Sequence, residues 1–252
     1  RIFSKVRHLP RIQATTHAGK MMPGKLYVTA TPIGDPDDIT VRAVKILNEV
    51  SFVICEDLRE AGKLLSKLGL KKELVTLNEH DEAENTPEIV QRIVEGDSAA
   101  LISDCGTPMF ADPGHRLLDD LIAFGVEVVP VPGASSLTAA LSVSGLHIEK
   151  FYYYGWLPVK KDARAGELTR IRKFREVIIF LETPYRLRNI MKDICDTFGR
   201  GIETVLAFDL TLPSEKIFRG SAGSILDKVT KQNLKGEFVL IVDNRNHKTL
   251  HK

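Results

Sequence analysis

The stretch AALISDCGTPMFADPG, residues 99–114, joins a short apolar run to a rigid, acidic loop. Its last eleven residues hold two prolines, two glycines and two aspartates, and a helical pattern, HRLLDDLIAFG, follows from residue 115. Strand, loop and helix in this order form the repeating unit of an open α/β sheet, in which ligands bind at the carboxyl ends of the strands. The stretch therefore predicts both a fold class and the position of a binding site.

The same unit recurs through the first half of the chain. Helical patterns of about ten residues separate short β-rich runs at 25–30, 51–57, 74–80, 99–104 and 126–133. This alternation predicts a parallel sheet that helices cover on both faces. Asp38 or Thr40 is expected to cap the first helix, and Thr86 with Pro87 to begin the helix before the fourth strand.

The second half has a different pattern, and the change near residues 145–151 predicts a domain boundary. Strong strand patterns lie at 175–182, 204–211 and 236–243, with helical patterns between them. We predict two α/β domains with the ligand cleft between them, the first a mostly parallel, doubly wound sheet. The expected division is a basic tail (1–23) that is disordered or not native, an N-terminal domain (24–146), a C-terminal domain (147–244) and a polar tail (245–252).

Composition excludes several classes of protein. The net charge of +2 hides five basic and no acidic residues among the first 20, so the rest of the 252-residue chain is slightly acidic. No apolar run approaches the roughly 18–20 residues of a membrane span, and no membrane partner is expected. The three cysteines form no Cys-x-x-Cys pair, which favours a reducing, cytoplasmic location without disulfides. No metal is expected, because no cluster has ligand spacing.

The loops at the strand ends favour a cationic ligand without phosphate. The chain lacks both GxxxxGK[ST] and GxGxxG, and its single G-x-G, Gly199 to Gly201, follows a helical pattern that it is expected to end. S-adenosylmethionine carries a sulfonium and an amino group, and acidic loops with exposed backbone groups suit it. Acidic turns at strand ends also cap helices, so the residues alone leave both interpretations open.

Seven motifs follow one another along the chain in this order: ATPIGDPDDIT (30–40), CEDLR (55–59), NEHDE (78–82), SDCGTPMFADPG (103–114), VPGASS (131–136), FLETPYRL (180–187) and GEFVLIV (236–242). Together they resemble the tetrapyrrole-methylase superfamily, and within it the ribosomal-RNA 2′-O-ribose methyltransferases that act on a cytidine of the small-subunit RNA. The resemblance runs from about Gly24 to Asp243. It implies S-adenosylmethionine as methyl donor, small-subunit ribosomal RNA as partner and a homodimer. The chain departs from the usual RNA-branch motifs at Leu58, Tyr185 and Leu212.

The resemblance and the loop chemistry together select the candidate donor-binding residues. These are Pro32, Asp104, Cys105, Gly106, Thr107, Pro108, Phe110, Ser135, Ser136, Leu181, Gly236, Glu237 and Phe238. Leu181 and Phe238 would flank the adenine, although core packing explains them equally well. Glu237 is also explained as an acid on an edge strand.

Acidic and basic residues at the ends of the second and third strands are candidates for acceptor chemistry. Asp57, Arg59 and His80 are predicted to orient the acceptor ribose, with a carboxylate or His80 taking the proton of its hydroxyl. An ordinary surface ion pair between Asp57 and Arg59 is the competing interpretation.

A basic segment after the domain boundary is a candidate RNA contact. It follows Tyr152, Tyr153, Tyr154 and Trp156, and cations with aromatic rings suit phosphates and bases. Its candidate residues are Lys160, Lys161, Arg164, Arg170, Arg172 and Lys173. The alternative interpretation, in which the segment is a solvated helix face and the tyrosines lie in the core, remains open. So do two other functions: a methyltransferase acting on a tetrapyrrole or another small anionic acceptor, and a non-catalytic RNA-binding protein that keeps the donor pocket.

Overall fold

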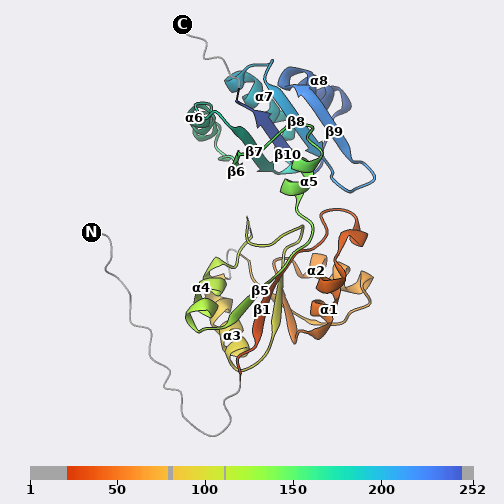
Figure 1. Cartoon of the computed structure of the whole chain (residues 1–252), viewed down its shortest axis with the longest axis vertical. Coiled ribbons are helices and arrows are strands. Elements are labelled where there is room, and N and C mark those ends of the chain that lie inside the picture. Colours follow the sequence, from red (N-terminus) through yellow and green to blue (C-terminus); the bar gives the residue numbers. More distant parts are fainter. Residues whose placement is uncertain (1–21, 79–81, 111, 246–252) are drawn as a thin grey trace, which may run out of the picture.

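The computed structural model describes residues 22–78, 82–110 and 112–245. His80 lies outside the described residues, as do nearly all of the predicted basic and polar tails. The described chain builds two five-stranded sheets, each with its own helices, one beyond the other along the long axis of the molecule (Figure 1). No described helix has both the length and the apolar character needed to cross a membrane.

The first sheet is parallel throughout and has the strand order β3-β2-β4-β1-β5. Its strands are β1 (Lys25–Thr29), β2 (Phe52–Cys55), β3 (Glu73–Thr76), β4 (Ala99–Ile102) and β5 (Glu127–Val131). Helices α1 (Val41–Glu49) and α2 (Leu58–Lys67) cover one face, and α3 (Glu82–Val94) and α4 (His115–Ala123) cover the other. The predicted α/β class and parallel sheet are confirmed.

Local sequence explains the helix starts in part. After the short 3-10 helix η1 (Pro36–Asp38), the side chain of Thr40 caps α1 by accepting a hydrogen bond from Ala43 N, so Thr40 is the cap and Asp38 is not. Strand β4 is fully buried because helices lie on both faces, and its AALI sequence is apolar at every position.

The predicted start of α3 at Thr86 and Pro87 is wrong, because the helix begins at Glu82 and Pro87 lies inside it. A proline lacks the N–H that a helix interior needs, which is why the sequence suggested a start there. The Glu82 carboxylate accepts hydrogen bonds from Gly114 N and Arg116 N, both at 3.0 Å. This long-range contact with the start of α4 fixes the first turn of α3 ahead of the proline.

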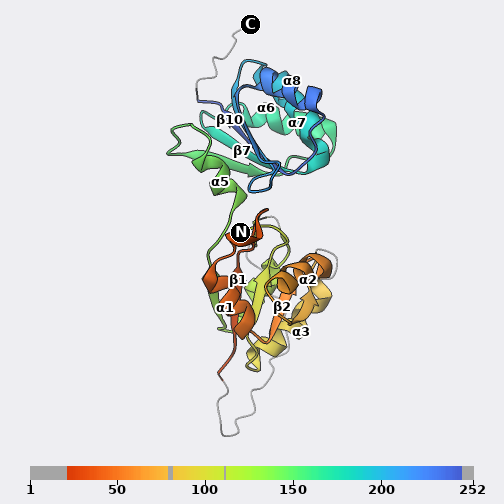
Figure 2. The ribbon, with the colours of Figure 1, turned by 90° about the vertical axis from the view of Figure 1, so that its right-hand side faces the viewer.

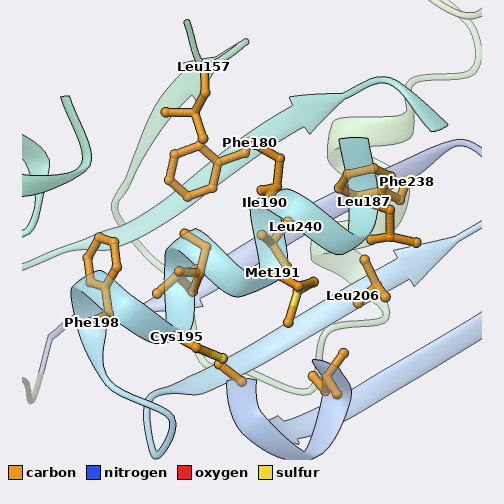
Figure 3. Packing of buried hydrophobic residues seen from close by; sticks show 14 of the residues in the cluster. Leu157, Phe180, Leu187, Ile190, Met191, Cys195, Phe198, Leu206, Phe238 and Leu240 are labelled. Carbon is orange, nitrogen blue, oxygen red and sulfur yellow. The ribbon is translucent and has the colours of Figure 1, made fainter. Parts of the chain in front are cut away.

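The second sheet is mixed, with the order β6-β7-β10-β8-β9, in which only β6 and β7 are parallel. Its strands are β6 (Phe151–Gly155), β7 (Val177–Glu182), β8 (Glu203–Phe208), β9 (Lys216–Ser221) and β10 (Phe238–Asp243). Helices α6 (Lys161–Ile171), α7 (Leu187–Phe198) and α8 (Ala222–Gln232) cover one face, and the 3-10 helix η2 (Pro184–Arg186) precedes α7. Figure 3 shows their shared core, in which Phe180, Met191 and Leu240 are fully buried.

Helix α5 (Ser136–Ser142) packs against the open face of the second sheet, where its Ala140 is buried among Val177, Ile179 and Val239. Figures 1 and 2 both show α5 beside that sheet, at the end of the segment that leaves the first. The chain thus crosses between the sheets ahead of α5, whereas the sequence pattern groups this helix with the first domain. The domain boundaries themselves stay a prediction.

Candidate active site

A cavity of about 810 Å³ lies between the two sheets and receives residues from both. The loops that follow β1, β2 and β4 form one side, and residues at the ends of β7, β8 and β10 form the other. Its volume lies at the upper end of the roughly 300–1,000 Å³ found for small-molecule sites. The cavity is therefore at the sheet edge where the sequence predicted a ligand.

Hydrogen bonds hold the loop after β4 in a fixed shape. The buried Thr31 hydroxyl donates to Ser103 O at 2.9 Å and accepts from Gly106 N at 3.1 Å. Thr107 Oγ1 donates to Ala134 O at 2.9 Å, which joins this loop to the one after β5. Gly106 has a φ of +87°, and a Cβ there would lie 3.0 Å from Ile33 Cγ2. The loop is thus preorganised beside the cavity.

The loop does not cap its own helix. Gly114 is the N-cap of α4 and supplies no side-chain hydrogen bond, while the carboxylate of Glu82 fills that role. The interpretation of this loop as a helix cap is therefore excluded for α4. Asp104 lines the cavity and does not cap α4.

The second sheet supplies an apolar wall to the cavity through Leu181, Leu210 and Phe238. Asp209 N donates to Glu237 O at 2.8 Å, which brings the turn after β8 close to the start of β10. Gly236 allows this approach, because a Cβ there would lie 2.1 Å from Asp209 Oδ1. Gly236 therefore has a packing role and does not line the cavity.

The cavity is strongly acidic. No lysine, arginine or histidine lines it among the described residues. Six carboxylates do: Glu56, Asp104, Asp112, Glu182, Asp209 and Glu237. Burial raises the pKa values of four of these carboxyls above their ordinary range: Asp104, Asp112, Glu182 and Glu237. Glu182 already pairs with the Arg186 guanidinium at 3.0 Å. The other carboxylates favour a cationic ligand, because a positive charge nearby stabilises their ionised forms.

The structure brings together ten of the thirteen predicted donor-binding residues as lining of this one cavity: Asp104, Cys105, Gly106, Thr107, Phe110, Ser135, Ser136, Leu181, Glu237 and Phe238. Pro32 lines a neighbouring cavity beside α2, and Pro108 is buried. For all thirteen residues, contact with the donor itself stays a prediction.

A third, shallower cavity contains Asp57 and Arg59, and Asp104 lies on its border with the first. The Asp57 carboxylate caps α2 by accepting from Arg59 N at 2.7 Å, and it pairs with the Arg59 guanidinium at 3.1 Å. The ion pair of the competing interpretation is therefore present, and it lowers the pKa of the Asp57 carboxyl. The predicted role of His80 stays a prediction, since that residue lies outside the described part of the chain.

The basic segment divides into structural and exposed residues. Arg164 is only 8% exposed, pairs with Asp193 at 2.6 Å and donates to Pro158 O and Val159 O. It does not reach the surface, so we remove it from the predicted RNA contacts. Arg170 pairs with Glu167 at 2.8 Å on the exposed face of α6.

Lys160, Lys161 and Lys173 are exposed, and Arg172 is half-buried. None of the six predicted RNA contacts lines the cavity. The tyrosines also separate: Tyr152 and Tyr154 pack against the core beneath α6, whereas Tyr153 faces the opposite side of the sheet and lines the cavity.

Several lining residues were missing from the predicted site, notably Asp112, Tyr153 and Asp209. Asp112 lies inside the predicted loop, and its carboxylate accepts from Ser103 Oγ at 3.0 Å, so the motif itself contained that signal. Tyr153 and Asp209 reach the cavity only because the second sheet faces the first. No local pattern in the sequence predicts that contact.

Comparison with known proteins identifies the family. The profile of the Tetrapyrrole (Corrin/Porphyrin) Methylases matches residues 25–226. The chain belongs to this family of S-adenosylmethionine-dependent methyltransferases, as the resemblance implied.

The similar curated proteins include several named Ribosomal RNA small subunit methyltransferase I, and two of them serve as examples. The one from Xylella fastidiosa is 39% identical over 87% of this chain and 81% of its own length. The one from Thermotoga maritima is 36% identical over 88% of this chain and 99% of its own length.

Among solved structures, uroporphyrin-III-C-methyltransferase from Thermus thermophilus matches with a TM-score of 0.62 and 22% identity, covering 88% of this chain and 96% of that one. A structure of that enzyme complexed with S-adenosylhomocysteine matches with a TM-score of 0.60 and 20% identity, covering 88% and 98%. These likenesses confirm the two-domain fold.

Proposed function

We propose that this methyltransferase transfers the methyl group of S-adenosylmethionine to the ribose 2′-oxygen of a cytidine in small-subunit ribosomal RNA. The observation that carries the proposal is the charge of the cavity, which has six carboxylates and no cation among its described lining residues. A cationic donor suits this lining, and the names of the curated relatives support RNA as the acceptor. A homodimer, which the family resemblance implied, is part of the same proposal.

The same charge disfavours a tetrapyrrole acceptor. Tetrapyrrole precursors carry several carboxylates of their own, and like charges in a partly buried site repel strongly. In an RNA, by contrast, the phosphates stay outside while an uncharged ribose and base approach. The acidic lining therefore favours the nucleotide over a small anionic acceptor.

The donor fits the residues on both sides of the cavity. It would supply a methyl group activated on a sulfonium. Asp104 and Glu237 would attract its positive charges, and Leu181 with Phe238 would flank its adenine. The hydrogen-bonded loop around Gly106 holds its side of the cavity in a defined geometry, and positioning of this kind contributes most to a transfer that needs three atoms in line.

The proton of the acceptor hydroxyl goes to a carboxylate. Asp57 is a poor base because the Arg59 guanidinium lowers its pKa, whereas burial raises the pKa of Asp104. Asp57 N also lies 3.4 Å from Asp104 Oδ1, so the two residues share one edge of the site. We therefore assign proton acceptance to Asp104 Oδ, with Asp57, Arg59 and His80 orienting the ribose.

The decisive experiment offers the full chain a labelled methyl donor and three acceptors: assembled small ribosomal subunits, naked small-subunit RNA and a porphyrinogen. The proposal expects label in the small-subunit RNA, free or assembled, and none in the porphyrinogen. Label in the porphyrinogen alone would support the tetrapyrrole alternative. Donor binding by calorimetry without transfer to any acceptor would support the non-catalytic alternative.

A further inference from the structure

Two exposed aromatic side chains line the cavity, one from the half of the molecule that contains the first sheet and one from the half that contains the second. Phe110 in the loop after β4 is 58% exposed, and Trp156 just after β6 is 51% exposed. Both line the same cavity as Tyr153, whose ring packs edge-on against Phe110 with the centroids 6.0 Å apart. Flat apolar faces therefore border the opening of a site that is otherwise acidic.

The backbone beside Trp156 is firmly held. Leu157 N donates to the buried Glu182 Oε1 at 3.0 Å, and Arg186 donates to Leu157 O at 3.0 Å and Pro158 O at 2.9 Å. The Leu157 side chain is buried next to Phe180 (Figure 3). The indole is thus presented from a fixed segment, which lowers the entropic cost of binding a ligand there.

The surroundings select what can lie against this indole. Carboxylates behind the aromatic rings repel phosphate, so a neutral flat ring is the suitable partner. The buried Tyr153 hydroxyl has no hydrogen-bond partner in the described part of the chain, which leaves one polar atom for a ligand. A nucleobase combines a flat face for stacking with polar edges for hydrogen bonds.

We propose that the base of the acceptor nucleotide leaves its stack and lies against Trp156, with Phe110 at the other side of the opening. This inference rests on the proposed function, because it assumes an RNA acceptor. The stacked base would place its ribose between the aromatic rings and the Asp104 edge of the cavity. Trp156 is then a specificity-determining residue for a reaction in which enzymes must extract a nucleotide from its neighbours.

The chain contains a single tryptophan, so its fluorescence reports on Trp156 alone. We would saturate the full chain with S-adenosylhomocysteine and then titrate a short single-stranded RNA that contains cytidine, following indole emission and the anisotropy of an RNA end label. Emission should fall and saturate at the RNA concentration at which the anisotropy saturates. RNA binding with unchanged indole emission would overturn the inference.

Variants separate stacking from donor binding and from folding. Trp156→Ala should raise the KM for the RNA acceptor by about 5- to 150-fold, whereas Trp156→Phe should restore most of the loss. Affinity for S-adenosylhomocysteine should stay within about twofold in both, since we place the adenine against Leu181 and Phe238 and not against Trp156. Phe124→Ala is the matched control, because Phe124 is a 55% exposed aromatic that does not line the cavity.

The outcomes distinguish this inference from the function on which it rests. If the wild-type chain methylates RNA but Trp156→Ala keeps its KM, only the stacking role fails. If Trp156→Ala loses affinity for S-adenosylhomocysteine as strongly as for RNA, the indole contacts the donor and the inference is wrong. If the wild-type chain neither binds nor methylates RNA, the proposed function fails and the inference falls with it.

Discussion

Asp57 and Asp104 are neighbours at the edge of the first sheet, and their surroundings shift their pKa values in opposite directions. The guanidinium and backbone N–H of Arg59 stabilise the ionised form of Asp57, whereas burial destabilises that of Asp104. Two carboxylates with separated pKa values are typical of sites in which one accepts a proton and the other keeps a fixed charge.

Exchanging each aspartate for asparagine tests this division of roles. Asp104→Asn should lower the single-turnover methylation rate by about 10²- to 10⁴-fold, the usual effect of removing a general base. Asp57→Asn should lower the rate less than Asp104→Asn, because it weakens the orientation of the ribose but removes no base. It should leave the melting temperature close to that of the wild type, because an asparagine oxygen can still cap α2. In the wild type, the rate should fall as the pH drops through the raised pKa of Asp104. Equal rates for both variants and the wild type would contradict the assignment.

Glu237 gives a prediction about stability and pH. Burial, and then repulsion from Asp209, raises its pKa in the folded protein. Folding therefore favours the protonated acid, and the stability that this contributes is full below the unfolded pKa and is lost as the pH rises through the folded value. Glu237→Gln should make the free protein more stable than the wild type at neutral pH, with the difference vanishing at acidic pH.

Thermal melts of Glu237→Gln and wild type between about pH 4 and 8 measure this difference, and calorimetry with S-adenosylhomocysteine measures the accompanying change in ligand affinity. We expect weaker binding of the cationic donor, because a carboxylate facing it is removed. A variant that is less stable at neutral pH and binds the donor as tightly as wild type would exclude an electrostatic role for Glu237.

At the scale of elements, α6 and its flanks carry two kinds of basic residue, and only one kind is available to RNA. Changing Lys160, Lys161 and Lys173 together to alanine should flatten the salt dependence of RNA binding by about 0.7 to 0.9 log units for each phosphate that is no longer neutralised. Donor affinity should be unchanged. An unaltered salt dependence would identify this face as merely solvated.

Arg164→Met provides the structural comparison on the same helix. Removing one member of a buried ion pair costs about 3–5 kcal/mol, because Asp193 would be left without the guanidinium 2.6 Å away. Urea unfolding should show this loss, while the salt dependence of RNA binding stays that of the wild type. A change in salt dependence without a change in stability would return Arg164 to the RNA-contacting surface.

The sequence predicted helices and strands correctly where local patterns determine them. The parallel first sheet follows from alternating strands and helices, and Gly199 ends α7 with a φ of +91° as its position suggested. The start of α3 did not follow, because contacts with Gly114 and Arg116 decide it. The burial of Arg164 likewise depends on its ion pair with Asp193, 29 residues away along the chain. Long-range partners of this kind leave no local signal.

At the scale of the whole molecule, the site exists only where the two sheets meet. Asp35 N donates to Thr211 Oγ1 at 2.9 Å, which ties the loop after β1 to the turn after β8. A Cβ at Gly34 would lie 2.6 Å from Leu210 O. The close approach at this glycine therefore sets the separation of the two walls of the cavity.

Gly34→Ala tests whether that separation matters. The added methyl group cannot fit without a shift of backbone, so the walls should move apart and affinity for S-adenosylhomocysteine should fall, while circular dichroism shows both sheets intact. Gly62→Ala is the matched control, because a Cβ there meets no atom within 4 Å. Unchanged affinity in Gly34→Ala would show that the donor does not bridge the sheets.

The position of the transferred methyl group tests the central claim most directly. A methyl group on the ribose 2′-oxygen blocks alkaline cleavage of the adjoining phosphodiester bond, because that oxygen is the attacking nucleophile. We predict that small-subunit RNA, labelled by this chain and hydrolysed in alkali, releases its label in a dinucleotide whose first nucleoside is 2′-O-methylcytidine. Label released with mononucleotides, as expected for a methylated base, would contradict the account.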